Sequence, residues 1–190
     1  MLITEVNSNA AGGEVFEIYN YGAAAVDLTG WKWDDDSASF TDVASGAFPR
    51  VVIVAGQRLV VVNTTDAAAF RSAWGIDTAV PVIAFSAPGL GGGDAIVLFD
   101  AAGKVRTWFN HKGVNMSASD GTVITPSAPS ARVSFTVGHA GLAFGGSTAV
   151  ASAVWDGVST SGPSYKAAAA GVLGGFAQPA VAAAVGSPGN

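Results

Sequence analysis

Hydrophobic and polar residues alternate along short stretches of the first part of the chain, which is the pattern of half-buried β-strands. Within residues 14–20, Phe16 and Ile18 fall on one face of the predicted strand and Glu17 falls on the other. The hydrophobic pattern predicts strands over residues 2–6, 14–20, 26–33, 51–54, 59–62, 80–85, 95–99 and 105–109. Turn residues separate them, and the D-A-A-G segment 100–103 is typical of a hairpin whose glycine has a positive φ. Strands at this spacing predict an all-β sandwich or barrel.

One short helix near 66–74 interrupts this series of strands. Thr65 and Asp66 are residues that can cap the first turn of a helix, and Gly75 is a residue that can end one. Phe70 and Trp74 are four residues apart and therefore share one face of the helix. We expect these two aromatic side chains to plug an open end of the hydrophobic core.

The second part of the chain has a weaker pattern, because Ala, Gly, Ser and Val dominate residues 111–190. Strands are predicted over residues 132–137 and 149–155. Residues 166–173 fit either a short helix or an irregular segment. We expect this irregular Ala- and Gly-rich extension to bury its small side chains against the strands of the first part or against another chain.

Composition and charge exclude several classes of protein. The chain has 190 residues, of which 49% are hydrophobic and 12% charged, so it can bury a core and is not disordered. Residues 1–110 hold 12 acidic and six basic side chains, whereas residues 111–190 hold two acidic and three basic ones. With a net charge of −5 and no cluster of Lys or Arg, a nucleic-acid partner is not expected. The absence of cysteine excludes disulfides, thiolate metal sites and a cysteine nucleophile.

Neither a membrane span nor an export signal is predicted within the sequence. The best candidate for a span, residues 167–185, is uncharged but consists mostly of Ala and Gly and contains a Gln-Pro pair. The first residues alternate like a strand and carry an acid, so they do not form a signal peptide. We expect that any export signal lies outside this sequence.

Several short motifs occur in an order that resembles one known family. In chain order they are L-I-T-E-V (2–6), E-I-Y-N (17–20), V-D-L-T-G-W (26–31), W-D-D-D (33–36), A-F-R-S-A-W-G (69–75), L-G-G-G-D-A-I-V-L-F-D (90–100) and G-S-P-G-N (186–190). This series resembles the lamin tail domain family in its bacterial, secreted form. The resemblance implies an immunoglobulin-like β-sandwich without an activity of its own, in secreted or surface proteins that often carry hydrolase domains. Since the motifs reach both ends, we expect residues 1–190 to form a single domain, with residues 111–170 as an insertion or subfamily extension.

A possible metal site is suggested by the acidic run Asp34, Asp35 and Asp36, which two serines follow. Carboxylate and hydroxyl oxygens are the ligands that Ca²⁺ prefers, so we treat these three residues as a calcium candidate. The run lacks the central Gly and the closing Glu of an EF-hand loop. The alternative is an exposed, hydrated acidic turn. No other cofactor is expected.

Tryptophans provide the candidate ligand-binding residues, because an indole face can stack on a sugar ring. Trp31, Trp33 and Trp108 are the candidates. The two tryptophans Trp31 and Trp33 share one face of their strand, and Lys32 lies on the other. This arrangement favours burial of both indoles over a sugar-binding platform.

No catalytic constellation is recognisable in the sequence. Glu17 lies within a strand, and the family resemblance implies that it serves as a structural hydrogen-bond anchor for neighbouring loop amides. A catalytic role would require a second carboxylate opposite it, which the sequence does not identify. His111 and His139 accompany no nucleophile or zinc motif and are expected to be loop residues without a special role. The glycine-rich segment 91–94 lacks the Lys-Ser/Thr ending of a phosphate-binding loop.

The sequence therefore predicts a non-catalytic interaction or assembly module located outside the cell or at its surface. The expected partners are another protein, further copies of the chain or a cell-surface polymer. An exposed strand edge would allow the copies to pair. The alternative hypothesis is a carbohydrate-binding module that accompanies a secreted hydrolase.

Overall fold

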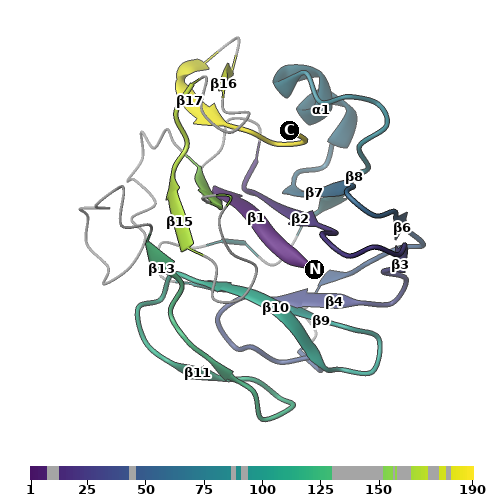
Figure 1. The fold of residues 1–190 in the computed structure, drawn as a ribbon, viewed down its shortest axis with the longest axis vertical. Coiled ribbons are helices and arrows are strands. Elements are labelled where there is room, and N and C mark those ends of the chain that lie inside the picture. Colours follow the sequence, from purple (N-terminus) through teal and green to yellow (C-terminus); the bar gives the residue numbers. More distant parts are fainter. Residues whose placement is uncertain are drawn as a thin grey trace.

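The structure of the chain is a computed structural model. The structure describes residues 1–7, 13–42, 46–86, 89–90, 94–129, 152–155, 157, 164–170, 176–178 and 181–190. Strands form several sheets, and one short helix lies beside them (Figure 1). The predicted strand 132–137, His139 and most of the glycine-rich segment 91–94 lie outside the described residues.

A large sheet contains both the start of the chain and strands from its second part. Its strand order is β13-β15-β14-β1-β2-β7-β8 within the described residues. The strands are β1 (Leu2–Asn7), β2 (Val15–Tyr19), β7 (Arg58–Asn63), β8 (Val82–Phe85), β13 (Ala128–Pro129), β14 (Ala153–Trp155) and β15 (Ser164–Ala167). β1, β2 and β7 are antiparallel neighbours, whereas β8 runs parallel to β7. The parallel pairing follows from the helical crossover between β7 and β8.

A smaller sheet has the strand order β10-β9-β4-β5. Its members are β4 (Lys32–Asp34), β5 (Gly46–Ala47), β9 (Ala95–Phe99) and β10 (Val105–Asn110). Three two-stranded pairs complete the described part: β3 (Val26–Asp27) with β6 (Val52–Ile53), β11 (Met116–Ser117) with β12 (Val123–Ile124), and β16 (Phe176–Gln178) with β17 (Val181–Gly186). The turn 100–103 joins β9 and β10 as predicted, and Gly103 has a φ of 77°.

The main core lies between the large and the smaller sheet. Phe16 and Ile18 of the large sheet and Trp33 and Leu98 of the smaller one belong to the same buried cluster. The rings of Phe16 and Trp33 pack edge to face, with 4.9 Å between their centroids. The predicted alternation in β2 and the predicted β-sandwich of immunoglobulin-like class are therefore confirmed.

The helix α1 (Ala67–Trp74) has the predicted ends. The Asp66 side chain accepts a hydrogen bond from the backbone N–H of Ala69, and Gly75 ends the helix in the left-handed conformation. Phe70 and Trp74 pack on Val60 and a few neighbours, on the face of the large sheet that is turned away from the main core. The prediction that they plug an open end of the core is wrong, because the outer face of β2 and β7 carries Val15, Val60 and Val62, which need a cover of their own.

Two further sequence predictions are corrected. The strand predicted over 26–33 is divided into β3 and β4, because the Asp27 carboxylate accepts hydrogen bonds from the backbone and side chain of Thr29 and turns the chain. Lys166 and Ala167 belong to β15 instead of a helix, since they pair with β14. Among the described residues, no helix has the length and apolar character needed to cross a bilayer.

Candidate functional site: a buried carboxylate pair beside a small cavity

Two buried carboxylates face each other in the centre of the large sheet. Glu5 of β1 and Glu17 of β2 are direct cross-strand partners, and each is 1% exposed. Directly opposed residues of an antiparallel pair point to the same face of the sheet. The register of β1 shifts between Ile3 and Glu5, and the extra residue Thr4 also contributes its hydroxyl to this face.

Glu17 is held by one cation and two neutral donors. Arg58 of β7 donates a charge-assisted hydrogen bond to Oε1 of Glu17, and the Thr4 hydroxyl donates to the same atom over 2.6 Å. The backbone N–H of Gly189, near the end of the chain, donates to Oε2 over 2.8 Å. Glu17 is thus the hydrogen-bond anchor for a loop amide that the sequence predicted.

Glu5 binds the same C-terminal segment through neutral donors. The backbone N–H of Ser187 lies 3.0 Å from both carboxylate oxygens, and the Ser187 hydroxyl donates to Oε2 over 2.8 Å. Ser152 donates a further hydrogen bond from its side chain. Gly186 passes so close that a Cβ atom there would lie 2.6 Å from Oε1 of Glu5. The segment 186–189 therefore closes over the carboxylate pair.

The surroundings of the two carboxylates differ in charge. Burial, and then the charge on Glu17, raise the pKa of Glu5 to about 7. Burial also raises the pKa of Glu17, but the charge of Arg58 and the donors Thr4 and Gly189 oppose this shift. When the pair of carboxylates holds one proton, that proton is best placed on Glu5, because Glu17 has a cation beside it and Glu5 has only neutral donors.

General acid–base catalysis also uses pairs of carboxyl groups with unequal pKa values. Here both are covered by the C-terminal segment, and both are used to bind it. The sequence did not identify Glu5 as the partner of Glu17. The sequence did contain a feature that could have identified Glu5. The first two predicted strands are joined by a short loop, and their pairing as a hairpin brings Glu5 near Glu17.

A cavity of about 200 Å³ adjoins this network. Its lining includes Thr4, Arg58, Val154, Trp155, Ser187 and Asn190. The guanidinium group of Arg58 also lies over the Tyr19 ring, 4.9 Å from its centroid. Trp155 was not among the tryptophans predicted to bind a ligand, because its strand is short and its place at this cavity depends on the pairing of β14 with β1.

The tryptophans predicted to bind a ligand lie in different environments. Trp31 and Trp33 belong to the main core and are 9% and 2% exposed, so their faces are not available for a sugar. This corrects their assignment as ligand-binding residues and confirms the burial that their spacing favoured. Lys32 points to the opposite face, where its ammonium group lies 4.9 Å from the Phe40 ring centroid. Trp108 is partly buried, and its indole N–H donates to the carbonyl of Thr125.

The acidic run turns inward at its first residue. Asp34 is 1% exposed, and its carboxylate accepts hydrogen bonds from the Ser37 hydroxyl and the backbone N–H of Ser39. Burial raises the pKa of Asp35 to about 6, and Asp36 is exposed. In the described part of the chain, no three His, Asp or Glu side chains are grouped as a metal site requires. Calcium binding at these residues stays a prediction.

His111 directly follows β10 and lies outside the strands, as the sequence predicted, but it is buried and has a structural role. It is 0% exposed, and its Nε2 accepts a hydrogen bond from the backbone N–H of Asp94 over 3.1 Å. The His111 backbone N–H in turn donates to the Asp94 carbonyl. His111 therefore ties the end of β10 to the start of β9.

Comparison with known proteins identifies the family to which this chain belongs. A family model described as Lamin Tail Domain matches residues 1–113 of the 190-residue chain. A comparison with curated proteins gave no match. The matched segment contains Glu5, Glu17 and Arg58, whereas the segment that they bind lies beyond it. Since the match covers more than half of the chain, this protein belongs to the lamin tail domain family and has its immunoglobulin-like fold.

Proposed function

We propose that this protein is a non-catalytic module that associates with further copies of itself outside the cell or at its surface. The observation that carries the proposal is the strand β8, which ends the large sheet within the described residues. Its side chains, those of Val82, Ile83, Ala84 and Phe85, are all apolar. Proteins usually protect such an edge with charged residues, a proline or a bulge, because its free backbone groups can pair with another strand.

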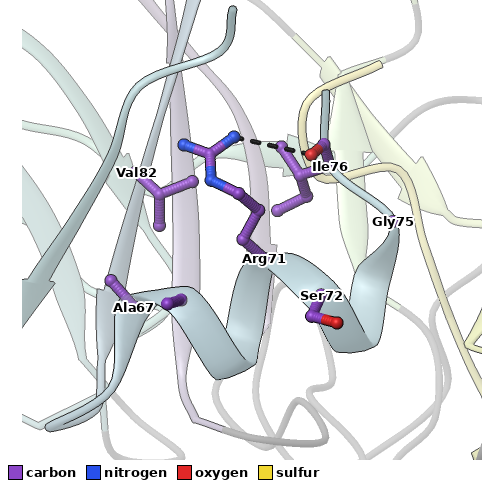
Figure 2. Close-up of a pocket in the computed structure, with 7 residues that line it drawn as sticks. Ala67, Arg71, Ser72, Gly75, Ile76 and Val82 are labelled. Carbon is purple, nitrogen blue, oxygen red and sulfur yellow. Dashed lines mark hydrogen bonds between the residues drawn. The ribbon is translucent and has the colours of Figure 1, made fainter. Parts of the chain in front are cut away.

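A groove beside this edge supports the proposal (Figure 2). A cavity of about 480 Å³ lies between α1 and β8, and its lining includes Ala67, Ala68, Ile76 and Val82. Arg71 also lines it, and its guanidinium is held in place by donating to the carbonyls of residues 76, 77 and 80. The edge and the groove together form a mostly apolar surface, with Arg71 as the charged residue of the groove lining, next to the open backbone groups of the edge.

A second copy of the chain is the occupant that charge favours. Each copy carries a net charge of −5, so two copies repel each other at long range. The apolar β8 edge is a place where two copies can meet without placing like charges against each other. Pairing of β8 with its symmetry mate would continue the large sheet through a closed, two-fold interface.

Light scattering across a range of protein concentrations tests this proposal. The wild-type protein is expected to shift from monomer to dimer as concentration rises, and Ala84→Lys is expected to remain monomeric because it places a charge at an exposed edge position. Val123→Lys on β12 is the matched control, since Val123 is 54% exposed in a different sheet. A wild-type protein that stays monomeric, or an Ala84→Lys variant that dimerises equally well, contradicts the proposal.

Carbohydrate binding is the second candidate function. It is favoured by Trp155, which is partly exposed and lines the cavity beside Arg58. Retention of the protein on insoluble neutral polysaccharides would support it. Equal passage of the protein through polysaccharide and blank matrices would contradict it.

A further inference from the structure

We propose that two copies of the chain join by antiparallel pairing of their β8 strands, with the two-fold axis at Ile83 and the α1 groove of each copy completed by the other. The inference rests on the self-association proposed above. It specifies which backbone groups the second copy binds, in which register, and which of its side chains enters the groove.

The hydrogen bonds to β7 determine which backbone groups of β8 remain open. The carbonyls of Pro81 and Phe85 accept hydrogen bonds from backbone N–H groups of β7 and of the residue directly after it, over 3.0 and 2.9 Å. The backbone groups of successive residues in a strand point to opposite sides. Those of Val82 and Ala84 therefore point away from β7. Within the described residues, they have no hydrogen-bond partner.

Symmetry limits how two such edges can pair. A two-fold axis perpendicular to the sheet makes the two β8 strands antiparallel. Outward-pointing residues must then lie opposite each other, because only these residues have free N–H and C=O groups. With the axis at Ile83, Val82 of each copy lies opposite Ala84 of the other. Every outward backbone group of the two strands is then paired.

Neighbouring registers leave some of these groups unpaired. An axis at Val82 would place Ala84 opposite Val80, whose N–H and C=O are already hydrogen-bonded within its own chain. An axis at Ala84 would place Val82 opposite Ser86, which lies in a bend beyond the end of β8. The register centred on Ile83 is therefore favoured.

The same register brings apolar side chains together on both faces of the joined sheet. Val82 lines the groove beside α1 (Figure 2). Directly opposed residues point to the same face, so Ala84 of the second copy lies beside Val82 and closes the open side of the groove. Ile83 packs against the main core. The two Ile83 side chains therefore meet on the other face of the sheet, next to the two main cores.

Single cysteine variants test this register, because the chain contains no cysteine and a new thiol can cross-link only to its counterpart. The two Ile83 positions form a non-hydrogen-bonded pair with Cα atoms about 4.5 Å apart, which a disulfide can span. The two Ala84 positions are diagonal neighbours at about 7–8 Å, beyond the usual reach of a disulfide. With oxidised glutathione, Ile83→Cys should form a covalent dimer at least about tenfold faster than Ala84→Cys.

The matched control is Ala84→Cys, since Ala84 is more exposed than Ile83 and random collisions would favour its thiol. A mixture of Val82→Cys and Ala84→Cys gives a second measurement, because these positions lie opposite each other across the interface. Mass spectrometry should detect mainly the mixed disulfide. Urea unfolding curves under reducing conditions show which variants are folded, and the mixture tests the register even if Ile83→Cys is not.

Light scattering on the wild-type protein separates the register from self-association itself. If the protein dimerises but Ala84→Cys cross-links as fast as Ile83→Cys, self-association stands and the register is wrong. If it dimerises and neither the single variants nor the mixture cross-links, the contact lies on another surface and the inference is overturned. A protein that stays monomeric at every concentration contradicts both the register and the proposed self-association.

Discussion

Glu5 and Glu17 occupy matching positions on neighbouring strands but differ in what holds their charge. Glu17 lies against the guanidinium of Arg58, whereas Glu5 meets only the neutral donors of Ser152 and Ser187. A buried carboxylate without a cation favours its protonated form. The pair therefore combines one ion pair with one carboxyl group that titrates near neutral pH.

The stability of the fold should consequently depend on pH through Glu5. Burial raises its pKa from 4.5 to about 7, so the unfolded chain loses this proton first as pH rises. The contribution of Glu5 to stability is complete below pH 4.5 and is lost as pH rises to about 7. Glu5→Gln mimics the protonated form. Relative to wild type, its free energy of unfolding should improve by about 2–3 kcal/mol between pH 5 and pH 8, as measured in urea.

Asp27→Asn is the matched control for this experiment. Hydrogen bonds from Thr29 lower the pKa of the exposed Asp27 carboxyl, so its contribution is present above its unfolded pKa and disappears only as pH falls below that value. Between pH 5 and pH 8, the difference between Asp27→Asn and wild type should stay constant. A Glu5→Gln curve parallel to wild type across this range would contradict the assignment of the proton to Glu5.

Gly186 is the second residue on which the closed segment depends. A Cβ atom at this position would lie 2.6 Å from Oε1 of Glu5 and 2.8 Å from the Ser152 hydroxyl. Gly186→Ala is therefore expected to lower the free energy of unfolding by about 1–3 kcal/mol, as measured in urea. In the control Gly22→Ala, the nearest atom is a side-chain oxygen of Asn20 at 3.2 Å, and a smaller loss is expected. Equal losses in the two variants would show that segment 186–189 does not press on Glu5.

At the scale of elements, α1 determines how β8 joins the end of the large sheet. The helix carries the chain from β7 back to the same end of the sheet, so β8 pairs in parallel and leaves its outer edge open. Its aromatic residues Phe70 and Trp74 cover the outer face of β2 and β7. The same short element thus completes a second small core and places one side of the groove next to β8.

The cap of this helix gives a test at the element scale. Asp66→Ala removes the carboxylate that binds the backbone N–H of Ala69, and should cost about 1 kcal/mol of stability. Thr65→Ala, one residue earlier at an exposed position, should leave stability unchanged within about 0.5 kcal/mol. Thermal unfolding followed by circular dichroism compares the two. Equal melting temperatures would mean that packing of Phe70 and Trp74 alone holds α1.

At the scale of the whole molecule, the part of the chain beyond the family match completes the sandwich. β14 pairs with β1, and β15 pairs with β14. The Tyr165 ring of β15 packs edge to face on Phe109, with 4.6 Å between centroids, and its hydroxyl donates to the carbonyl of Ile3. The closing segment then binds Glu5 and Glu17.

A truncated chain of residues 1–113 should therefore not fold stably, although it spans the whole family match. It would expose the edge of β1 and leave two buried carboxylates without their Ser187 and Gly189 donors. We expect the full chain to unfold in one cooperative urea transition and the truncated chain to show none. A cooperative transition in the truncated chain would instead identify the remainder as a separate unit.

Much of the fold was predictable because its signals are local. The alternation in β2, the capped helix and the hairpin turn at Gly103 each depend on residues within a few positions of one another. The period-two spacing of Trp31 and Trp33 likewise indicated their burial. The family resemblance, which rested on the order of short motifs, agrees with the match over residues 1–113.

By itself, the sequence determined most strands of the first part of the chain, the helix with its caps, the sandwich class and the family. Only the tertiary structure decided that Glu5 faces Glu17, that Ser187 and Gly189 bind them, and that Trp155 and Arg58 line the same cavity. These partners lie up to 182 positions apart in the chain. Strand register and chain path bring them together, and no pattern among neighbouring residues encodes either one.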